Sequence, residues 1–381
     1  MNNRELNFRV IAAALRRRAE RLVGRERDYF SGTPPGLALS PSARHFADYE
    51  TAPLALRFSA QDGDVSRWQT TARAKLAELS GYRRESSAPK VAHEFIFPLP
   101  GGLSRRTVYL HARTGVDIPV HLIGLPGKQQ RRPVMICLQG TNSGAHLSWG
   151  EARLPGDHAL AGYDFAIQAA SRGYLAVAIE QNCFGERAER KIDPRSAAPC
   201  VDATMHSILL GRSLIGERGS DVSAVIDWLE VEHESLGIDV KNIHAMGHSS
   251  GGSVALFAAA MDTRIGAVLA CGCIGYIRDT IGRRRDDQGQ NVIPGILNWL
   301  EMADLVGLVA PRTFVTVAGE TDHIWPAAGC AAVTDEAKVV FARCNAASRL
   351  LCVAEPGGHK FRPDASWRAF FSVVSAPASG I

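Results

Sequence analysis

The spacing of apolar residues changes at about residue 90, which divides the chain into two regions. Before that point, apolar residues recur at helical spacing in two separate stretches. The first stretch carries Phe8, Ile11, Leu15, Ala19 and Leu22, and the second carries Trp68, Ala72, Leu76 and Leu79. Asp64 and Gly81 have the residue types that begin and end helices, so we expect the second helix between them. Residues 31–53 show little periodicity, and the pattern predicts no regular element there.

We therefore expect residues 1–90 to form an N-terminal helical extension and residues 91–381 to form the main domain. The sequence leaves three roles open for the extension. It could cover a site on the main domain, mediate a homodimer, or pack against that domain.

From residue 91 onward, short apolar runs alternate with helical patterns. The runs that read as strands cover 91–97, 107–111, 118–123, 134–138, 174–179, 243–246, 265–270, 313–317 and 350–353. The first three leave no room for helices between them, so we expect them to be antiparallel. The later runs are continuously apolar, as in strands buried on both faces. Helices are expected at about 162–172, 218–232, 250–260 and 333–346. The pattern predicts an α/β fold, with a mostly parallel sheet of about eight strands flanked by helices.

Composition and charge narrow the class of protein. Hydrophobic residues make up 46% of the chain and charged residues 22%, as in an ordinary globular protein, and no apolar run is long enough to span a membrane. Arg16, Arg17 and Arg18 follow the first apolar stretch, whereas a signal peptide has its charges first. We therefore expect a cytoplasmic protein. The net charge is +4, but the arginines are scattered among acids, so we expect no nucleic-acid partner.

The chain has eight cysteines, an even number that could suggest disulfides. However, Cys137, Cys271 and Cys352 lie inside predicted strands, where a free cysteine serves as a small apolar residue. The chain contains no Cys-x-x-Cys pair, so we expect reduced thiols and no zinc site. No motif calls for a cofactor or a metal.

The segment Gly247-His248-Ser249-Ser250-Gly251 matches G-x-S-x-G. An apolar strand precedes it and a helical pattern follows it, so Ser249 is expected on a sharp strand-to-helix turn. Glycines on both sides relieve the crowding that such a turn creates. The turn would expose the hydroxyl of Ser249 as a nucleophile, with His248 packed beside it.

A nucleophilic serine needs a base, and the base needs an acid that orients it. In this kind of sheet the order along the chain is serine, acid, histidine. Asp322 follows the predicted strand 313–317, and His359 follows the predicted strand 350–353. Glu320 and Asp279 remain rival candidates for the acid.

The negative oxygen formed during acyl transfer needs two hydrogen-bond donors. One is expected to be the backbone N–H of Ser250, the residue after the nucleophile. The other is expected from the loop Gln139-Gly140-Thr141-Asn142-Ser143-Gly144, where small residues let the backbone approach a ligand. We favour Thr141 in that loop.

These residues resemble the α/β-hydrolase superfamily, and within it the dienelactone hydrolase-like and acetyl xylan esterase-like serine hydrolases. The resemblance covers residues 91–381. It is carried by five segments: Leu138–Thr141, Leu210–Leu229, Met246–Gly252, Met302–Arg312 and Gly319–Asp322. The nucleophile, acid and base of that family map onto Ser249, Asp322 and His359. Two features depart from the family: dienelactone hydrolases have cysteine as nucleophile, and many members have His-Gly where this chain has Gln139-Gly140.

The resemblance implies hydrolysis of carboxylic esters through an acyl-enzyme intermediate. The insertions that follow Gln181 and Tyr276 are both charged, which fits short acyl groups on a small polar alcohol better than lipids. Two alternatives remain open. One is a peptidase or acyltransferase on the same fold, and the other is a binding protein without catalytic activity.

Overall fold

The computed structural model describes residues 36–37, 39–58, 63–113, 115–126, 131–188, 199–283 and 289–375. The chain divides into two units, Met1–Ala47 and Asp48–Ile381, and the sheet lies in the second unit. The helix expected over Phe8–Leu22 lies outside the described residues. The boundary expected at residue 90 and the homodimer stay predictions.

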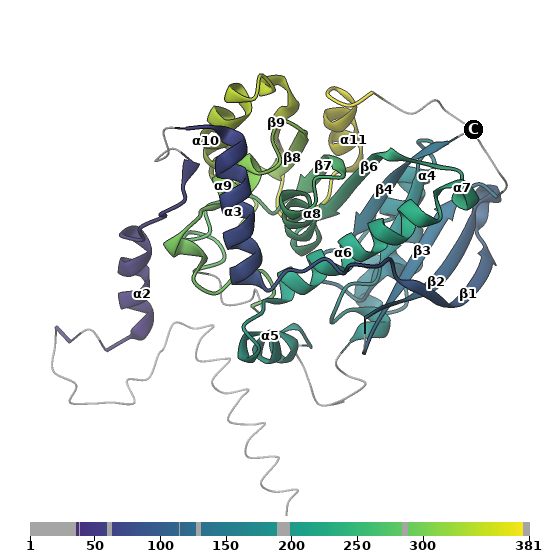
Figure 1. Ribbon diagram of the computed structural model, residues 1–381, viewed down its shortest axis with the longest axis horizontal. Coiled ribbons are helices and arrows are strands. Elements are labelled where there is room, and N and C mark those ends of the chain that lie inside the picture. The colour runs from purple at the N-terminus through teal and green to yellow at the C-terminus, as the bar shows by residue number, and fades with distance from the viewer. Residues whose placement is uncertain are drawn as a thin grey trace, which may run out of the picture. The chain divides into compact units, whose positions relative to one another are not determined.

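The second unit is built on one sheet of nine strands, in the order β1-β2-β3-β5-β4-β6-β7-β8-β9 (Figure 1). The strands are Lys90–Pro98 (β1), Ser104–Arg113 (β2), Val116–Gly124 (β3), Arg132–Leu138 (β4), Leu175–Ile179 (β5), Ile238–His248 (β6), Ile265–Cys271 (β7), Thr313–Gly319 (β8) and Leu350–Glu355 (β9). The pairs β1–β2, β2–β3 and β3–β5 are antiparallel, and the six strands from β5 to β9 are parallel to one another. All nine predicted runs are strands, which confirms the α/β class and the antiparallel start.

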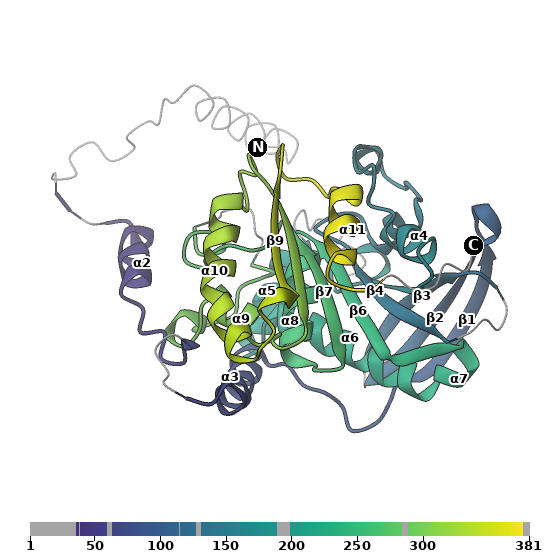
Figure 2. The same ribbon diagram turned by 90° about the horizontal axis from the view of Figure 1, so that it is seen from above.

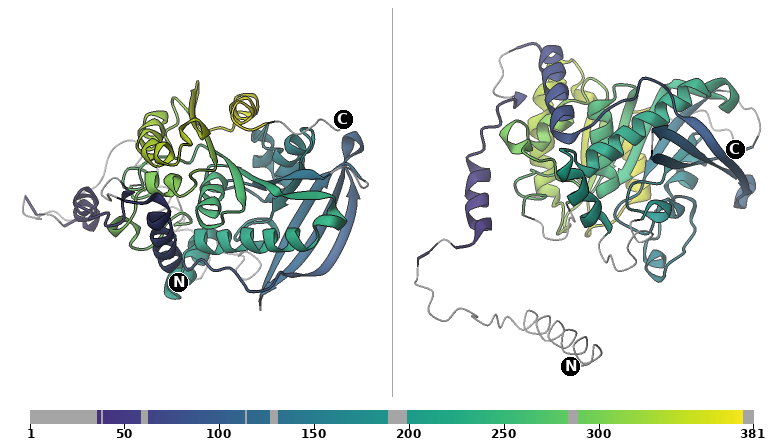
Figure 3. Two further views of the ribbon diagram at one scale, coloured as in Figure 1. Left: turned by 45° about the horizontal axis from the view of Figure 1, so that its top comes forward. Right: turned by 60° about the horizontal axis from the view of Figure 1, so that its bottom comes forward.

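Helices cover both faces of the sheet (Figure 2). The helices are Pro41–Glu50 (α2), Val65–Ser80 (α3), Phe165–Ala170 (α4), Pro199–Leu209 (α5), Leu214–Val231 (α6), His233–Leu236 (α7), Ser250–Met261 (α8), Met302–Gly307 (α9), Ala327–Arg343 (α10) and Pro363–Phe371 (α11). On one face α8 packs on β6 and β7, and α6, the long green helix in Figure 3, packs on α8. On the other face α4 packs on β5, and α11 packs on β8. The central parallel strands are therefore buried on both sides, as their continuous apolar sequences require, whereas every residue of β1 is exposed.

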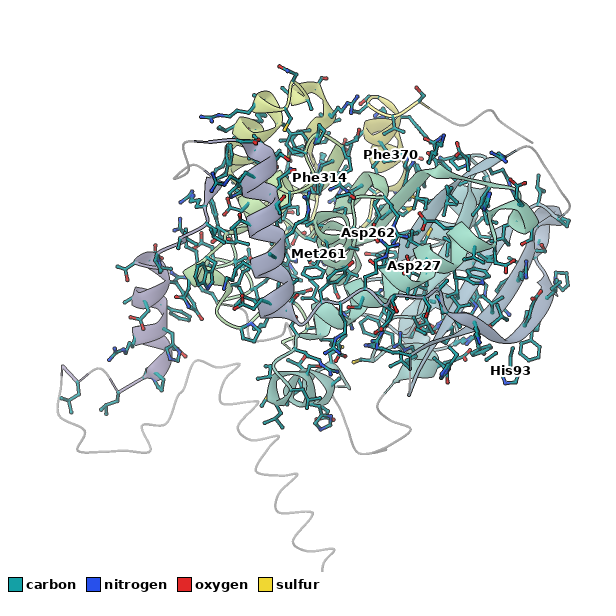
Figure 4. All side chains as sticks on the ribbon, in the orientation of Figure 1. His93, Asp227, Met261, Asp262, Phe314 and Phe370 are labelled. Carbon is teal, nitrogen blue, oxygen red and sulfur yellow. The ribbon has the colours of Figure 1, made fainter. Side chains whose placement is uncertain are left out.

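Buried apolar side chains and ion pairs fix α6 and α8 in place. Trp228 of α6 and Phe257 of α8 are almost fully buried in the same hydrophobic cluster, and each such side chain contributes roughly 1.5–3 kcal/mol by leaving water. Arg264 then links the two helices, because it pairs with Asp227 of α6 and with Asp262, which ends α8, each at 2.6 Å. Asp227 and Asp262 are labelled in Figure 4. The C-terminal end of α8 is thereby fixed to α6.

The N-terminal residues of the second unit include a helix that the sequence predicts accurately. The side chain of Asp64 accepts a hydrogen bond from the N–H of Ser66 at 2.8 Å, and Gly81 ends α3 in a left-handed conformation, with φ 68°. Helix α3 packs on α6 and α8. Both predicted ends of this helix are confirmed.

Several elements differ from the expectation. The stretch 31–53, where no element was expected, contains α2, which begins with Pro41 directly after Ser40. Proline favours the first position of a helix, and serine favours the position before it, so this pair marks a helix start inside a segment rich in loop-forming residues. Helix α10 begins at Ala327, six residues before the expected position, and α5, α7, α9 and α11 were not expected. Within the described ranges, no helix is long and apolar enough to cross a membrane.

Candidate active site

Ser249 lies on a strained turn between β6 and α8, as the sequence predicts. Its backbone has φ 57° and ψ −129°, a conformation that side-chain-bearing residues rarely adopt. A Cβ atom at Gly247 would overlap the backbone of Gly251, and one at Gly251 would overlap the carbonyl oxygen of Leu138. The two glycines are therefore required because β4, β6 and α8 approach one another closely here. This confirms the reason that the motif suggests for them.

The structure brings Ser249, His359 and Asp322 into one hydrogen-bonded line. Nε2 of His359 lies 3.0 Å from Oγ of Ser249, and its Nδ1 lies 2.7 Å from Oδ2 of Asp322. The three residues follow the carboxyl ends of β6, β8 and β9, which lie side by side in this part of the sheet with only β7 between β6 and β8. In this arrangement Nδ1 donates to the carboxylate, which leaves Nε2 free to accept the hydroxyl proton of the serine.

Asp322 is held as a carboxylate by its surroundings. Its side chain is only 1% exposed, and burial by itself raises its pKa. Hydrogen bonds from His359 and from the backbone N–H groups of Ile324 and Trp325, at 2.8 and 2.9 Å, outweigh this effect, so that the pKa lies below its usual value. The acid therefore stays ionised and oriented toward the histidine.

The two rival acids lie elsewhere. Glu320 is exposed, and its backbone N–H bonds to the carbonyl of Glu355. The side chain of Asp279 is 53% exposed and lies 3.9 Å from Arg283. The geometry of the described residues therefore favours Asp322 over both alternatives.

The loop expected to supply an oxyanion donor lies directly against Ser249. A Cβ atom at Gly140 would lie 3.3 Å from Cβ of Ser249, which brings the next residue, Thr141, to the mouth of the site. Ser250 is the first residue of α8, and the first N–H groups of a helix have no acceptor within the helix. Thr141 and Ser250 thus flank Ser249 from two different elements.

His248 packs beside Ser249 and His359, as the motif suggests. It is 2% exposed, and its ring lies 4.7 Å from the ring of His359. Burial, reinforced by the nearby His359, lowers the pKa of His248 to about 3, so that its ring is neutral. The hydroxyl of Tyr163 lies 3.3 Å from Nδ1 of His248. This neutral ring supports His359 without competing with it for the proton of Ser249.

No sequence pattern singled out two buried polar residues below the site. Arg218 of α6 and Gln290 both contact the side chain of Ser250. Arg218 is part of a segment that carries the family resemblance, but its spacing gave it no role. Gln290 follows a charged insertion without periodicity, so that only the three-dimensional structure brings it to the site.

The buried side chain of Glu180 contacts two loops, one at Ala145 and one at Gly185. Glu180 follows β5 and is 3% exposed, and its Oε1 accepts a hydrogen bond from the N–H of Ala145 at 2.9 Å. Gly185 packs so closely on this carboxyl group that a Cβ atom there would overlap it. Burial raises the pKa of Glu180 to about 7.

The stability of the protein should therefore depend on pH through Glu180. The folded state keeps the proton of this carboxyl up to about pH 7, whereas an unfolded glutamate loses it near pH 4.5. Deprotonation between these values favours the unfolded state, so stability is lost as the pH rises. Compared with the Glu180→Gln variant, the wild type should lose up to about 3 kcal/mol of unfolding free energy between pH 4.5 and 7.5.

Urea unfolding of both proteins across this pH range would measure the difference. The Glu78→Gln variant is a matched control, because Glu78 is 65% exposed on α3. Its difference from the wild type should stay constant. A constant difference for Glu180→Gln as well would show that folding does not raise the pKa of this carboxyl.

Among the described residues, no group of three or more histidine, cysteine, aspartate or glutamate side chains is arranged to hold a metal ion. The buried thiols of Cys137 and Cys271 lie in β4 and β7, as the sequence predicts, whereas Cys352 in β9 is half-buried. The described side chains of the site are those of a hydroxyl nucleophile with a histidine and a carboxylate.

No protein-family model matches the chain. YtaP of Bacillus subtilis (strain 168), which is described as a hydrolase, is 24% identical over 197 residues. That match covers 51% of this chain and 62% of the relative's length.

Solved structures resemble the fold over most of its length. A Bacteroides fragilis protein described as an acetyl xylan esterase has a TM-score of 0.67 and 16% identity, covering 92% of this chain and 93% of that one. A glucuronoyl esterase from Solibacter usitatus has a TM-score of 0.58 and 14% identity, covering 84% of this chain and 96% of that one. At such identities the likeness is one of fold. The chain therefore has the α/β-hydrolase fold, as its resemblance to the dienelactone hydrolase-like and acetyl xylan esterase-like serine hydrolases implied.

Proposed function

We propose that the protein is a serine esterase that hydrolyses short-chain carboxylic esters, with Ser249 as nucleophile. The observation that carries this proposal is the hydrogen-bonded line from Oγ of Ser249 through His359 to the buried carboxylate of Asp322. A strained turn that exposes a serine, with a base and an orienting acid in reach, matches the requirements of nucleophilic catalysis. YtaP is described as a hydrolase, and the Bacteroides and Solibacter proteins are described as an acetyl xylan esterase and a glucuronoyl esterase. These descriptions support the same reaction.

In the first half-reaction, Oγ of Ser249 bonds to the ester carbonyl carbon while its proton passes to Nε2 of His359. The π electrons of the carbonyl move to its oxygen, which is stabilised by the N–H of Ser250 and by Thr141. When this oxyanion collapses, the bond to the alcohol oxygen breaks, and the alcohol takes the proton from His359. Water then repeats both steps, which releases the acid and restores Ser249.

The substrate is proposed to carry a short acyl group, acetyl to butyryl, on a polar alcohol such as a sugar. Glu186 and Arg187 are the described part of the charged insertion after β5, and Arg187 pairs with Asp221 at 2.8 Å. The charged sequences of this insertion and of the one after Tyr276 favour polar substrates over lipids. The carbohydrate esterase names of the structural neighbours support the same choice, by analogy.

We expect kcat/KM to be highest for p-nitrophenyl esters of two to four carbons and to fall steadily toward twelve carbons. Measuring the series from acetate to laurate tests this expectation, with p-nitroacetanilide as the amide control for a peptidase. An optimum at eight carbons or longer would contradict the proposed preference for short acyl groups and favour a lipase. The cytoplasmic location expected from the sequence stays a prediction.

A further inference from the structure

Arg218 is a buried cation without a carboxylate partner. It is 1% exposed, and none of the described acidic side chains lies within ion-pair distance of it. Its guanidinium group donates to Oγ of Ser250 at 3.1 Å, to Oε1 of Gln290 at 3.0 Å and to the carbonyl oxygen of Asn182 at 2.8 Å. Burial of an unpaired charge is costly, so this position calls for an explanation. Because both terminal nitrogens are already engaged, Arg218 does not itself reach a substrate.

The hydrogen bonds of Arg218 fix the direction of a chain that leads to the mouth of the site. A guanidinium can only donate, so the oxygen of the Gln290 amide must face Arg218. The hydroxyl of Ser250 donates to the same oxygen at 2.9 Å. The amide nitrogen of Gln290 is thereby turned toward Thr141 and donates to its Oγ1 at 2.7 Å.

This chain leaves the hydrogen of the Thr141 hydroxyl unused. Oγ1 accepts from Gln290, and a hydroxyl that accepts one hydrogen bond still has its own hydrogen to donate. Thr141 is exposed at the mouth of the site, and the preceding Gly140 lies against Ser249. Gln290, in contrast, is 2% exposed and is held from below by Arg218.

We propose that the hydroxyl of Thr141 is an oxyanion donor, and that Gln290 and Arg218 are positioning residues that aim it. Arg218 orients the amide of Gln290, and Gln290 orients the hydroxyl of Thr141 toward the position of the negative oxygen. The charge of Arg218, which none of the described carboxylates neutralises, also favours the anionic tetrahedral intermediate over the neutral ester. This inference rests on the proposed esterase function. It identifies the side-chain hydroxyl of Thr141 as the donating group and adds Gln290 and Arg218 as positioning residues.

The test measures kcat and KM for p-nitrophenyl acetate, together with the inhibition constant of an alkyl boronic acid. Oγ of Ser249 adds to the boron as its proton passes to His359, which produces an anionic tetrahedral boronate like the intermediate. Thr141→Val should lower kcat about 100-fold, since removal of one oxyanion donor costs about 10² to 10³. KM should change little, and boronate affinity should fall by the same factor as kcat/KM. Thr141→Ser, which keeps the hydroxyl, should recover most of the loss.

Two variants of Gln290 test the hydrogen bond to Thr141 and the charge of Arg218. Gln290→Met removes the hydrogen bond to Thr141, so kcat and boronate affinity should fall together. Gln290→Glu replaces the donor with a carboxylate, which accepts the hydrogen of the Thr141 hydroxyl and also lies beside Arg218, so its losses should be larger. Equal losses in the two variants would overturn the role given to the charge of Arg218.

Thr70→Val is the matched control, because Thr70 bonds only within helix α3. Its kinetics and thermal midpoint should match those of the wild type. Retention of wild-type kcat in Thr141→Val would overturn the proposal for the hydroxyl, whatever the fate of the other variants. If the wild-type protein itself hydrolyses no ester and shows no Ser249-dependent labelling, the proposed function fails instead, which is a distinct result.

Discussion

Replacement of Ser249 by alanine should abolish ester hydrolysis and labelling by a fluorophosphonate probe, with the fold unchanged. Loss of the nucleophile from a serine triad lowers turnover by about 10⁶-fold, because the three residues act as a unit and the atom that attacks the carbonyl is missing. The fold should survive, because Ser249 lies at the surface of the site and its side-chain hydrogen bond is to His359 alone. Turnover of p-nitrophenyl acetate and probe labelling on gels would measure the effect.

Ser253→Ala is the matched control, since Ser253 lies one turn further along α8 and bonds only to the carbonyl oxygen of Ser249. It should label normally and retain activity within about threefold, as most substitutions away from reacting atoms do. The circular dichroism spectra of both variants should match that of the wild type. If Ser249→Ala still labels and turns over within tenfold of the wild type, another residue is the nucleophile.

The sheet and the helix α3 could be predicted from the sequence because their signals are local. Continuous apolar runs show burial on both faces, and the antiparallel start follows from the short spacing of β1, β2 and β3. Asp64 and Gly81 mark the ends of α3 by the hydrogen bonds and backbone angles that such residues favour. Helix α2 was missed because the loop-forming composition of its surroundings outweighed the single start signal at Ser40 and Pro41.

The candidate site also combines residues that local sequence signals identify with residues that they do not. Ser249, Asp322 and His359 could be selected because each follows a recognisable strand, and the ends of parallel strands meet at one edge of the sheet. Arg218 and Gln290 carry no such mark. Their place depends on how α6 and the segment after residue 288 pack beneath Ser250, which is a property of the tertiary structure.

Asp322 is the residue for which the sequence left rivals open, and its replacement should have the second largest effect. Asp322→Asn should lower turnover about 10⁴-fold, because an amide cannot fix the tautomer of His359 that accepts the proton of Ser249. The carboxylate accepts three hydrogen bonds, from His359 and from the N–H groups of Ile324 and Trp325. An asparagine oxygen can keep the two backbone bonds, so that the loop should retain its shape while the histidine loses its partner.

Glu320→Gln is the matched control, because it changes a carboxylate to an amide two residues away on an exposed side chain. Its turnover should stay within about threefold of the wild type, as for a surface substitution that contacts no reacting atom. Both variants make the same chemical change, so a difference between their turnovers identifies the acid by its position in the chain. A larger loss in Glu320→Gln than in Asp322→Asn would transfer the role to Glu320. A modest loss in both would point to Asp279, although its carboxylate lies beside Arg283 in the structure. Steady-state turnover of p-nitrophenyl acetate by Asp322→Asn, Glu320→Gln and Asp279→Asn would decide among the three acids.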